Sequence, residues 1–224
     1  MLFVCWVTVV MLVACSGREA SSRPSDEWDT LEAFFSTHAD SISTAPRWMR
    51  HEAFRRMEAA EDSLVKYNYL SLTLKTFLMT SQLDSARWGI RRIEEFTAGQ
   101  PASPRVYDLR SECLNMQGNI WARTGNMDSA KAAFQQAYEL RMKGRQTDAI
   151  PDILMNLADA CNRLGRLDEG ASWYRRALLL CDSLQLAPTR RTPIYYGLAQ
   201  IYVALRDFDQ CDYYYNLAGR GYDT

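Results

Sequence analysis

The stretch GNMDSAKAAF at residues 125–134 decides the fold, because variants of it occur three more times along the chain. The variants are SQLDSARWGI at 81–90, GRLDEGASWY at 165–174 and RDFDQCDYYY at 206–215. Each copy has a large apolar residue, then Asp, one variable residue and a small residue. The small residues are Ala86, Ala130, Gly170 and Cys211, at intervals of 44, 40 and 41. Such a period indicates a repeat protein, whose units pack mainly on their neighbours.

The chain around each copy has helical periodicity. Apolar residues fall at i, i+3, i+4 and i+7 in Leu154, Leu157, Ala158 and Cys161, and similarly in Ala171, Tyr174, Leu178 and Cys181. Gly125 and Gly165 stand between such segments, where a tight turn requires a left-handed residue. Three positions after each glycine is an aspartate, Asp128 or Asp168, which we expect to cap the next helix. The pattern predicts helix–turn–helix units.

These units resemble tetratricopeptide repeats, whose pattern is W-x2-L-G-x2-Y, then A-x3-F, then A. One unit matches at Leu114, Gln117, Gly118, Trp121, Gly125, Ala130, Phe134 and Ala137. The next matches at Leu154, Leu157, Ala158, Cys161, Gly165, Gly170, Tyr174 and Ala177, and the last at Tyr195, Leu198, Ala199, Tyr202, Cys211, Tyr215 and Ala218. The first unit (Leu70, Leu74, Phe77, Ala86, Ile90) is the most degenerate, and Arg206 replaces the turn glycine of the last.

The resemblance covers residues 66–224, as about four repeats of the family's long-period branch. It implies an all-α fold, a right-handed superhelical solenoid of antiparallel helix pairs. Residues 26–65 contain two further helical stretches broken at 43–46, the second running through Met49, Phe54, Met57 and Leu64. We expect residues 26–65 to form an N-terminal cap, with a further degenerate repeat as the alternative.

Residues 2–14, LFVCWVTVVMLVA, contain no charge and are too few to span a bilayer, which is typical of a signal peptide over residues 1–14. The end of this stretch and the next residue, Leu12-Val13-Ala14-Cys15, resemble the lipobox of bacterial lipoproteins. This resemblance implies that Cys15 becomes the lipid attachment site and that the protein is anchored to a membrane of the bacterial cell envelope. Polar residues 15–25 then form a flexible tether. The alternative is a buried N-terminal helix or strand of a cytosolic protein.

Charge and motifs argue against several function classes. Lys and Arg total 26 and Asp and Glu total 27, so the net charge of -1 does not favour nucleic-acid binding. His38 and His51 lack metal-site spacing, and the sequence contains no nucleophile elbow or nucleotide-binding glycine loop. Cys113, Cys161, Cys181 and Cys211 lack C-x-x-C spacing and are expected to be buried apolar residues, with one oxidised pair as the alternative. We therefore expect no catalysis, cofactor or metal.

In tetratricopeptide proteins the first helices of successive repeats line a concave groove that binds peptides or extended chain segments. The register places ten candidate residues there: Asn115, Asn119, Arg123, Met155, Asp159, Asn162, Arg163, Tyr196, Gln200 and Val203. Their amide and guanidinium groups suit the backbone of an extended partner, and Met155 and Tyr196 supply apolar contact. The family's carboxylate clamp is not supported, because Asn119 and Asn156 fit it but Pro193 and Gly197 replace its basic residues.

The resulting hypothesis is a non-catalytic, membrane-anchored interaction scaffold that binds a protein or peptide partner. The alternatives are an outer-membrane ligand-capture lipoprotein and a shortened sensor or regulatory region of a longer signalling protein.

The aromatic residues predict one further surface. Trp121, Phe134, Tyr174, Tyr202 and Tyr215 occupy core positions of the repeat. Tyr213, Tyr214 and Tyr215 are consecutive and span about 200° of a helix, so at least one ring cannot face its own repeat. No polar capping helix follows them in the sequence. We expect an exposed aromatic C-terminal edge that pairs with a second copy or another partner.

Overall fold

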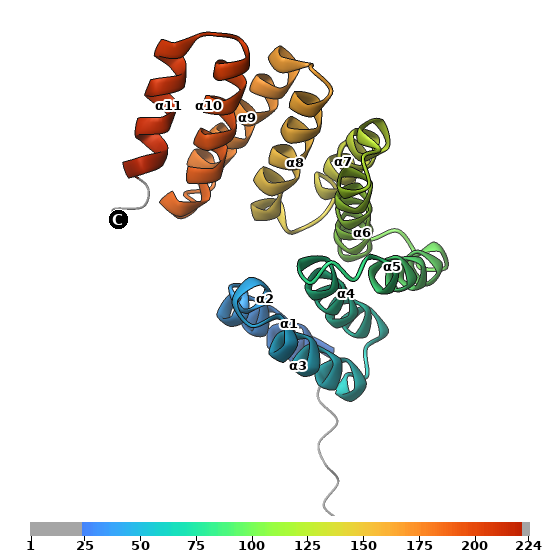
Figure 1. Ribbon diagram of the computed structural model, residues 1–224. Helices are drawn as coiled ribbons and strands as arrows, with labels where there is room; N and C mark the ends of the chain where they lie inside the picture. The colour runs from blue at the N-terminus through green and yellow to red at the C-terminus, as the bar shows by residue number, and fades with distance from the viewer. Residues whose placement is uncertain (1–23, 221–224) are drawn as a thin grey trace, which may run out of the picture.

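The computed structural model describes residues 24–220, and every regular element in that range is helical. The helices are α1 (Pro24–His38), α2 (Ser41–Thr44), α3 (Pro46–Ala59), α4 (Ser63–Met79), α5 (Leu83–Ala98), α6 (Pro104–Arg123), α7 (Met127–Arg141), α8 (Ile150–Arg163), α9 (Leu167–Ser183), α10 (Thr192–Ala204) and α11 (Phe208–Arg220). Two 3₁₀ turns, η1 (Thr147–Ala149) and η2 (Pro188–Arg190), precede α8 and α10. Figure 1 shows antiparallel helix pairs stacked along a curved path, which confirms the predicted all-α, right-handed superhelical solenoid.

Four helix pairs follow one another from α4 onward, namely α4–α5, α6–α7, α8–α9 and α10–α11. The first helices of the last three pairs begin with a proline in their first turn: Pro104, Pro151 and Pro193. Proline is favoured there because the first turn needs no backbone donor and the φ angle of proline is already helical. Each pair therefore has a defined point at which its first helix begins.

The turn inside each pair has the same backbone geometry in all four copies. The residue with positive φ is Ser81 (58°), Gly125 (88°), Gly165 (74°) or Arg206 (59°). The residue after it donates its N–H to a carbonyl five positions earlier, as in Asn126 to Trp121 at 2.9 Å and Asp207 to Tyr202 at 2.9 Å. This is a Schellman-type helix end, which requires a left-handed residue. The predicted turn glycines are confirmed, and Arg206 adopts the same conformation.

The expected caps of the second helices differ from the observed ones. Asp128 and Asp168 do not cap α7 and α9, because each lies inside the first helical turn. The N-cap of α7 is Asn126, whose side chain accepts from the Ser129 N–H at 3.2 Å, and the N-cap position of α9 is Arg166. The aspartates instead place negative charge near the helix N-terminus, where the helix dipole favours it.

Substitutions at two left-handed turn positions, Gly125 and Arg206, should change the free energy of unfolding in opposite directions. Gly125→Ala is expected to lower the free energy of unfolding by about 1 kcal/mol, and Arg206→Gly to raise it by a similar amount. A Cβ at Gly125 would meet no atom within 4 Å, so the cost is conformational and not steric. Urea unfolding measures both changes. Wild-type stability in Gly125→Ala would contradict this interpretation.

The core is a series of clusters shared by neighbouring units. One cluster joins α4, α5 and α6, the next joins α7 and α8, and another joins α8, α9 and α10. The repeat positions predicted from the sequence lie inside these clusters, for example Ala86, Phe134, Ala158 and Tyr174. Each unit thus buries its apolar face only against adjacent units, as expected for a solenoid.

The N-terminal helices differ in detail from the expectation for residues 26–65. A short additional helix, α2, overlaps the first half of the predicted break at 43–46, and α3 ends at Ala59, so Leu64 belongs to α4. Helix α3 buries Met49 and Ala53, whereas Phe54 points to solvent with 47% of its surface exposed. Trp28, Leu31 and Phe34 of α1 pack with α3 and α4 in a separate cluster.

The four described cysteines, Cys113, Cys161, Cys181 and Cys211, are buried and unpaired. Cys161 and Cys181 belong to core clusters, although the equivalent positions of the preceding repeat carry the larger Trp121 and Arg141. Burial raises the pKa of the Cys161 thiol to about 11, so it stays protonated at neutral pH. These side chains act as small apolar residues in the core.

Candidate functional site

Two adjoining cavities lie along the first helices of the repeats, α4, α6, α8 and α10. Their volumes are about 300 and 310 Å³. The first is lined mainly by α4, α6 and the start of α8, with Ile42 of α2 at its edge, and the second by α6, α7, α8 and Gln200 of α10. Both include Asn119 and Arg123, so they form one continuous surface. We call this surface the concave groove.

Seven of the ten groove candidates line this surface: Asn115, Asn119, Arg123, Asp159, Asn162, Arg163 and Gln200. Met155, Tyr196 and Val203 line neither cavity. Met155 is half-buried and packs on the core formed by α8, α9 and α10. Tyr196 is exposed, but its ring lies edge-on to Tyr215 with centroids 5.7 Å apart. Met155 and Tyr196 therefore supply no apolar contact to either cavity.

Two of the groove arginines, Arg123 and Arg163, bind the preceding repeat. Arg123 on α6 donates to the carbonyl of Leu78 near the end of α4, and Arg163 on α8 donates to the carbonyl of Ala122 at 3.1 Å. Leu78 and Ala122 occupy the same register position in successive first helices. Because the C-terminal turn of a helix has unpaired carbonyls and a partial negative charge, each arginine caps the previous first helix. Each arginine thus has a structural contact as well as a surface facing the groove.

Amide side chains link two first helices across the groove floor. Asn156 on α8 donates from Nδ2 to Oδ1 of Asn115 on α6 at 2.9 Å. Asn119 donates to the Asn115 carbonyl in its own helix at 3.0 Å. Asn162 and Gln200 add two more amides to the same surface. The groove is therefore rich in groups that both donate and accept hydrogen bonds, which suits the backbone of a bound chain.

Asp159 is held in the groove by the core of its own repeat. Its carboxylate accepts a hydrogen bond from the hydroxyl of Tyr174, whose ring is 2% exposed. Desolvation raises the pKa of the Asp159 carboxyl above its ordinary value, against the opposing effect of that hydrogen bond. The Tyr174 ring also fills the space beside Gly197, where a Cβ would lie 2.2 Å from its Cζ. A basic side chain of the carboxylate clamp could not stand at position 197.

A buried charge network under the groove was not foreseen from the sequence. Arg141 at the end of α7 is only 1% exposed and contacts Asp108 Oδ1 at 3.4 Å and Glu112 Oε2 at 3.2 Å. Lys75 of α4 contacts the same Glu112 at 3.1 Å. Burial acts to raise the pKa of Glu112, but Lys75 and Arg141 outweigh it and lower that pKa below its usual range. The network joins α4, α6 and α7, and Lys75, Glu112 and Arg141 line the groove.

One of these residues could have been found from the sequence. Lys75 shares its register position with Asn119, Asp159 and Gln200, since the spacings are again 44, 40 and 41. Extending the register into the degenerate first unit therefore predicts Lys75 as a groove residue. Arg141 carries no such signal, because charged residues near a helix end are usually solvated.

The C-terminal edge exposes aromatic rings, as expected from the run Tyr213 to Tyr215. Tyr213 and Tyr215 are 56% and 41% exposed, whereas Tyr214 stacks on Tyr202 with centroids 5.6 Å apart. The prediction of a core position for Tyr215 is therefore wrong, because within residues 24–220 no further helix pair covers it as α10 covers Tyr174. Pairing of this edge with a second copy stays a prediction.

The expected lipid attachment site, Cys15, lies outside the described residues, as do the signal peptide at residues 1–14 and most of the tether at 15–25. Across residues 24–220, no helix has both the length and the apolar character needed to cross a membrane. Over the same residues, no three side chains of the metal-ligating types come together.

Comparisons with known proteins agree with this architecture. A family model of the tetratricopeptide repeat matches residues 111–141 and 151–183, which fall on α6–α7 and α8–α9. The stacked helix pairs define an α-solenoid of the protein-interaction class. The chain thus contains tetratricopeptide repeats, matched by the family model at these two helix pairs. No curated protein sequence is a significant match to it.

Two solved structures share the fold over most of the chain. BtubC (BKLC) from P. vanneervenii is 19% identical, with a TM-score of 0.60, and the match covers 84% of this chain and 72% of BtubC. PlcR from Bacillus thuringiensis, solved with the peptide PapR7 and DNA, is 14% identical, with a TM-score of 0.69. The match covers 87% of this chain and 70% of PlcR. At these identities the likeness is one of fold. The tetratricopeptide repeats support a protein-interaction scaffold.

Proposed function

We propose that the protein is a non-catalytic scaffold that binds an extended peptide or a segment of a partner protein in the concave groove. The observation that carries this proposal is the continuity of the two cavities, which share Asn119 and Arg123 and run from α4 to α10. An extended chain presents backbone donors and acceptors at regular intervals. The amides of Asn119, Asn162 and Gln200 can pair with both kinds of group.

The chemistry of the groove favours a peptide over a nucleic acid. Its charges are mixed, since Asp159 lines it together with Arg123 and Arg163, and the whole chain has a net charge of -1. A phosphate backbone requires a surplus of Lys and Arg along its path. The PlcR structure, which shares the fold, contains the peptide PapR7. That likeness supports a peptide partner without identifying its sequence.

The groove proposal is tested by changing Asn119, Asn162 and Gln200 together to alanine. These three side chains line the groove, and the one hydrogen bond recorded for them among the described residues, from Asn119 to the Asn115 carbonyl, lies within α6, so we expect the fold to survive. Peptides are first selected on the wild-type chain from a display library of random ten-residue sequences. Fluorescence anisotropy then measures their affinity, which should fall by a factor of about 10 or more, because two or three hydrogen bonds are lost.

A matched control changes Gln135, Ser172 and Asn216, which are exposed polar residues on the second helices. This control variant should bind the selected peptides like the wild type. If the groove variant also keeps full affinity, the peptide site lies elsewhere on the molecule.

We further propose that the mature protein is held at a membrane of the bacterial cell envelope by lipid on Cys15. The support is the sequence alone, namely the uncharged run 2–14, the lipobox-like Leu12 to Cys15 and the polar tether that follows. Growth with radiolabelled palmitate should label the wild type, and Cys15→Ala should lose the label completely. Equal labelling of the two chains, or none of the wild type, would refute the anchor.

A further inference from the structure

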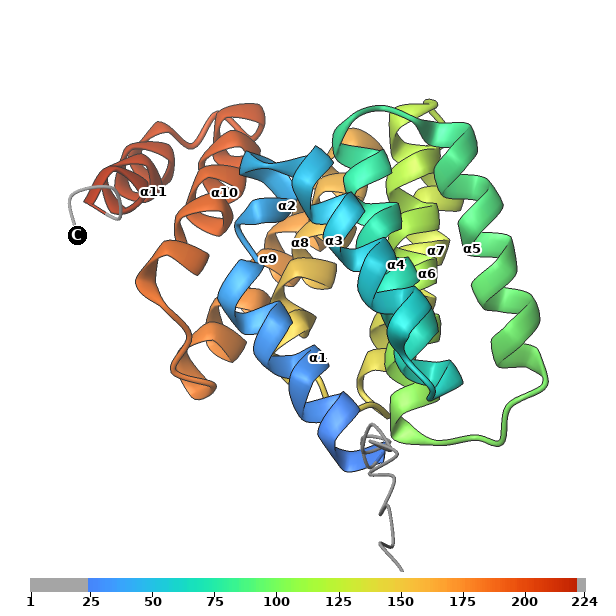
Figure 2. The ribbon, with the colours of Figure 1, turned by 90° about the horizontal axis from the view of Figure 1, so that it is seen from below.

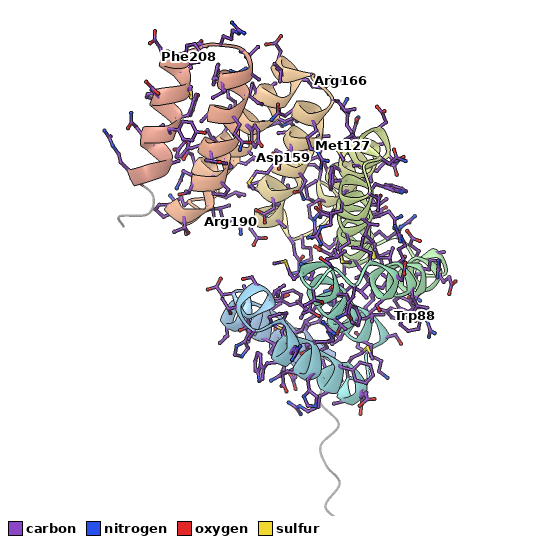
Figure 3. All side chains as sticks on the ribbon, viewed as in Figure 1. Trp88, Met127, Asp159, Arg166, Arg190 and Phe208 are labelled. Atoms are coloured by element: carbon purple, nitrogen blue, oxygen red, sulfur yellow. The ribbon has the colours of Figure 1, made fainter. Side chains whose placement is uncertain are left out.

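A hollow of about 330 Å³ lies on the outer side of the solenoid, away from the concave groove. Its apolar lining comes from Phe54 and Met57 of α3, Tyr67 and Leu70 of α4, and Trp88 of α5. The charged residues Glu58, Lys66 and Arg92 complete the lining. We call it the α3–α5 hollow. In Figure 3, Trp88 projects at the outer edge of the molecule beside α5, whereas Asp159 lies within the curve.

The exposed rings of this hollow, Trp88 and Phe54, belong to none of the core clusters found among the described residues. Trp88 is 52% exposed and Phe54 is 47% exposed. Ala132 and Ser172 stand at the positions equivalent to Trp88 in the next two repeats, and both are also exposed. The solenoid therefore requires no aromatic residue at this position. Two exposed rings that line one apolar hollow form a patch, and exposed apolar patches mark contacts outside the chain.

The chemistry of the hollow fits the interfacial layer of a lipid bilayer. The guanidinium of Arg92 lies over the Trp88 ring, 5.3 Å from its centroid, and Lys66 adds a second cation. Tryptophan concentrates at the boundary of water and hydrocarbon, where its ring is apolar and its N–H remains polar. Arg and Lys side chains extend from apolar surroundings to phosphate head groups. Glu58 is the one acidic residue of the lining.

The described chain begins at the end of the solenoid that carries this hollow. The Glu27 carboxylate accepts the backbone N–H groups of Glu61 and Asp62, each at 2.9 Å, which fixes the start of α1 beside the start of α4. Glu58 and Lys66 of the hollow flank those two residues in the sequence. Figure 2 shows α1, α3, α4 and α5 together on the underside of the molecule. Residues 15–23, fully extended, reach at most about 32 Å.

We propose that the α3–α5 hollow is a membrane-contact surface, in which Trp88 and Phe54 enter the interfacial layer of the bilayer. The inference rests on the proposed lipid anchor at Cys15, which would keep the hollow within reach of the membrane. A lipid-modified cysteine fixes only one point of the chain at the membrane, and a second contact of this kind strengthens the attachment. The contact also orients the solenoid, with the concave groove on a different face from the membrane.

In the test, a lipid coupled chemically to Cys15 takes the place of the lipid that the cell would attach. The mature chain, residues 15–224, is coupled through the Cys15 thiol to maleimide lipid in phosphatidylethanolamine–phosphatidylglycerol vesicles. The other four cysteines are buried, which directs the coupling to Cys15. The chain has other tryptophans, so the emission of Trp88 is obtained by subtracting the emission of the Trp88→Phe variant from that of the wild type. On tethering, its quenching by iodide should fall about threefold or more, and brominated lipid should quench it.

Two further variants separate the contact from a general effect of tethering. Phe54→Ser should restore most of the iodide access of Trp88, because it removes the second ring of the hollow. Leu179→Ser, which changes an exposed apolar residue on α9, should leave Trp88 shielded. Circular dichroism confirms that each variant is folded.

Two results would overturn the membrane contact. One is equal iodide access of Trp88 in the tethered and free chains. The other is shielding of Trp88 from iodide that increases with protein concentration in the absence of vesicles. That result would make the hollow a protein-docking surface. Both are independent of acylation in the cell, because the tether is chemical. Failure of palmitate labelling would refute the anchor and not this contact.

Discussion

Arg141→Met is expected to lower the free energy of unfolding by about 3–5 kcal/mol, because it leaves buried carboxylates without their cation. Asp108 and Glu112 both contact Arg141, and Asp108 also accepts the backbone N–H of Arg145 at 2.8 Å. Losing the arginine therefore disturbs both α6 and the loop before α8. Chemical unfolding of the purified chain, followed by circular dichroism, measures the change.

The neighbouring Arg145→Met is the matched control for Arg141→Met. Arg145 is exposed, and only its backbone takes part in the network. Its replacement should change stability by less than about 0.5 kcal/mol. Equal stability of the two variants would show that the buried network does not hold the second repeat together.

Gly197→Ala is expected to cost about 1–3 kcal/mol, the usual range for overpacking a tight core. The new Cβ would lie 2.2 Å from both Cζ and Oη of Tyr174, whose ring is buried and tied to Asp159. Gly219→Ala, at an α11 position with no atom within 4 Å, should not destabilise the protein. Thermal or urea unfolding of the two variants compares them directly.

A double-mutant cycle tests the contact between Tyr174 and Gly197. Tyr174→Ala alone should cost about 3–5 kcal/mol, because it empties a space in the core. In that background Gly197→Ala should cost almost nothing, since the ring that it meets has been removed. Additive costs would mean that the two repeats do not meet at this point.

The repeat register and the turns could be predicted from the sequence because they depend on local patterns. Gly125 and Gly165 mark left-handed turns, and the spacing of Ala86, Ala130 and Gly170 marks the buried face of each second helix. Arg206 shows the limit of this signal. It adopts a φ of 59° although no local preference requires it, because the hydrogen bonds of the turn and the packing of α10 on α11 impose that conformation.

The same register brought most of the groove candidates to one surface. Asn119, Asp159 and Gln200 share one helical position, so the stacking of units sets them side by side. Met155 shares a position with Asn115, yet it packs on the core. The position of a residue within the repeat predicts the helix face on which it lies. The direction of its side chain depends on the neighbours that it packs against in the fold.

The sequence by itself determined the helical pairs, their period and the two glycine turns, since propensity and periodicity act over a few neighbouring residues. Only the tertiary structure decided that Arg141 is buried against Asp108 and Glu112, residues about 30 positions away in the chain. It likewise decided that Tyr174 is covered by α10 while Tyr215 is not. The physical reason is that burial depends on which helices stack on a face, and that information lies in the arrangement of units.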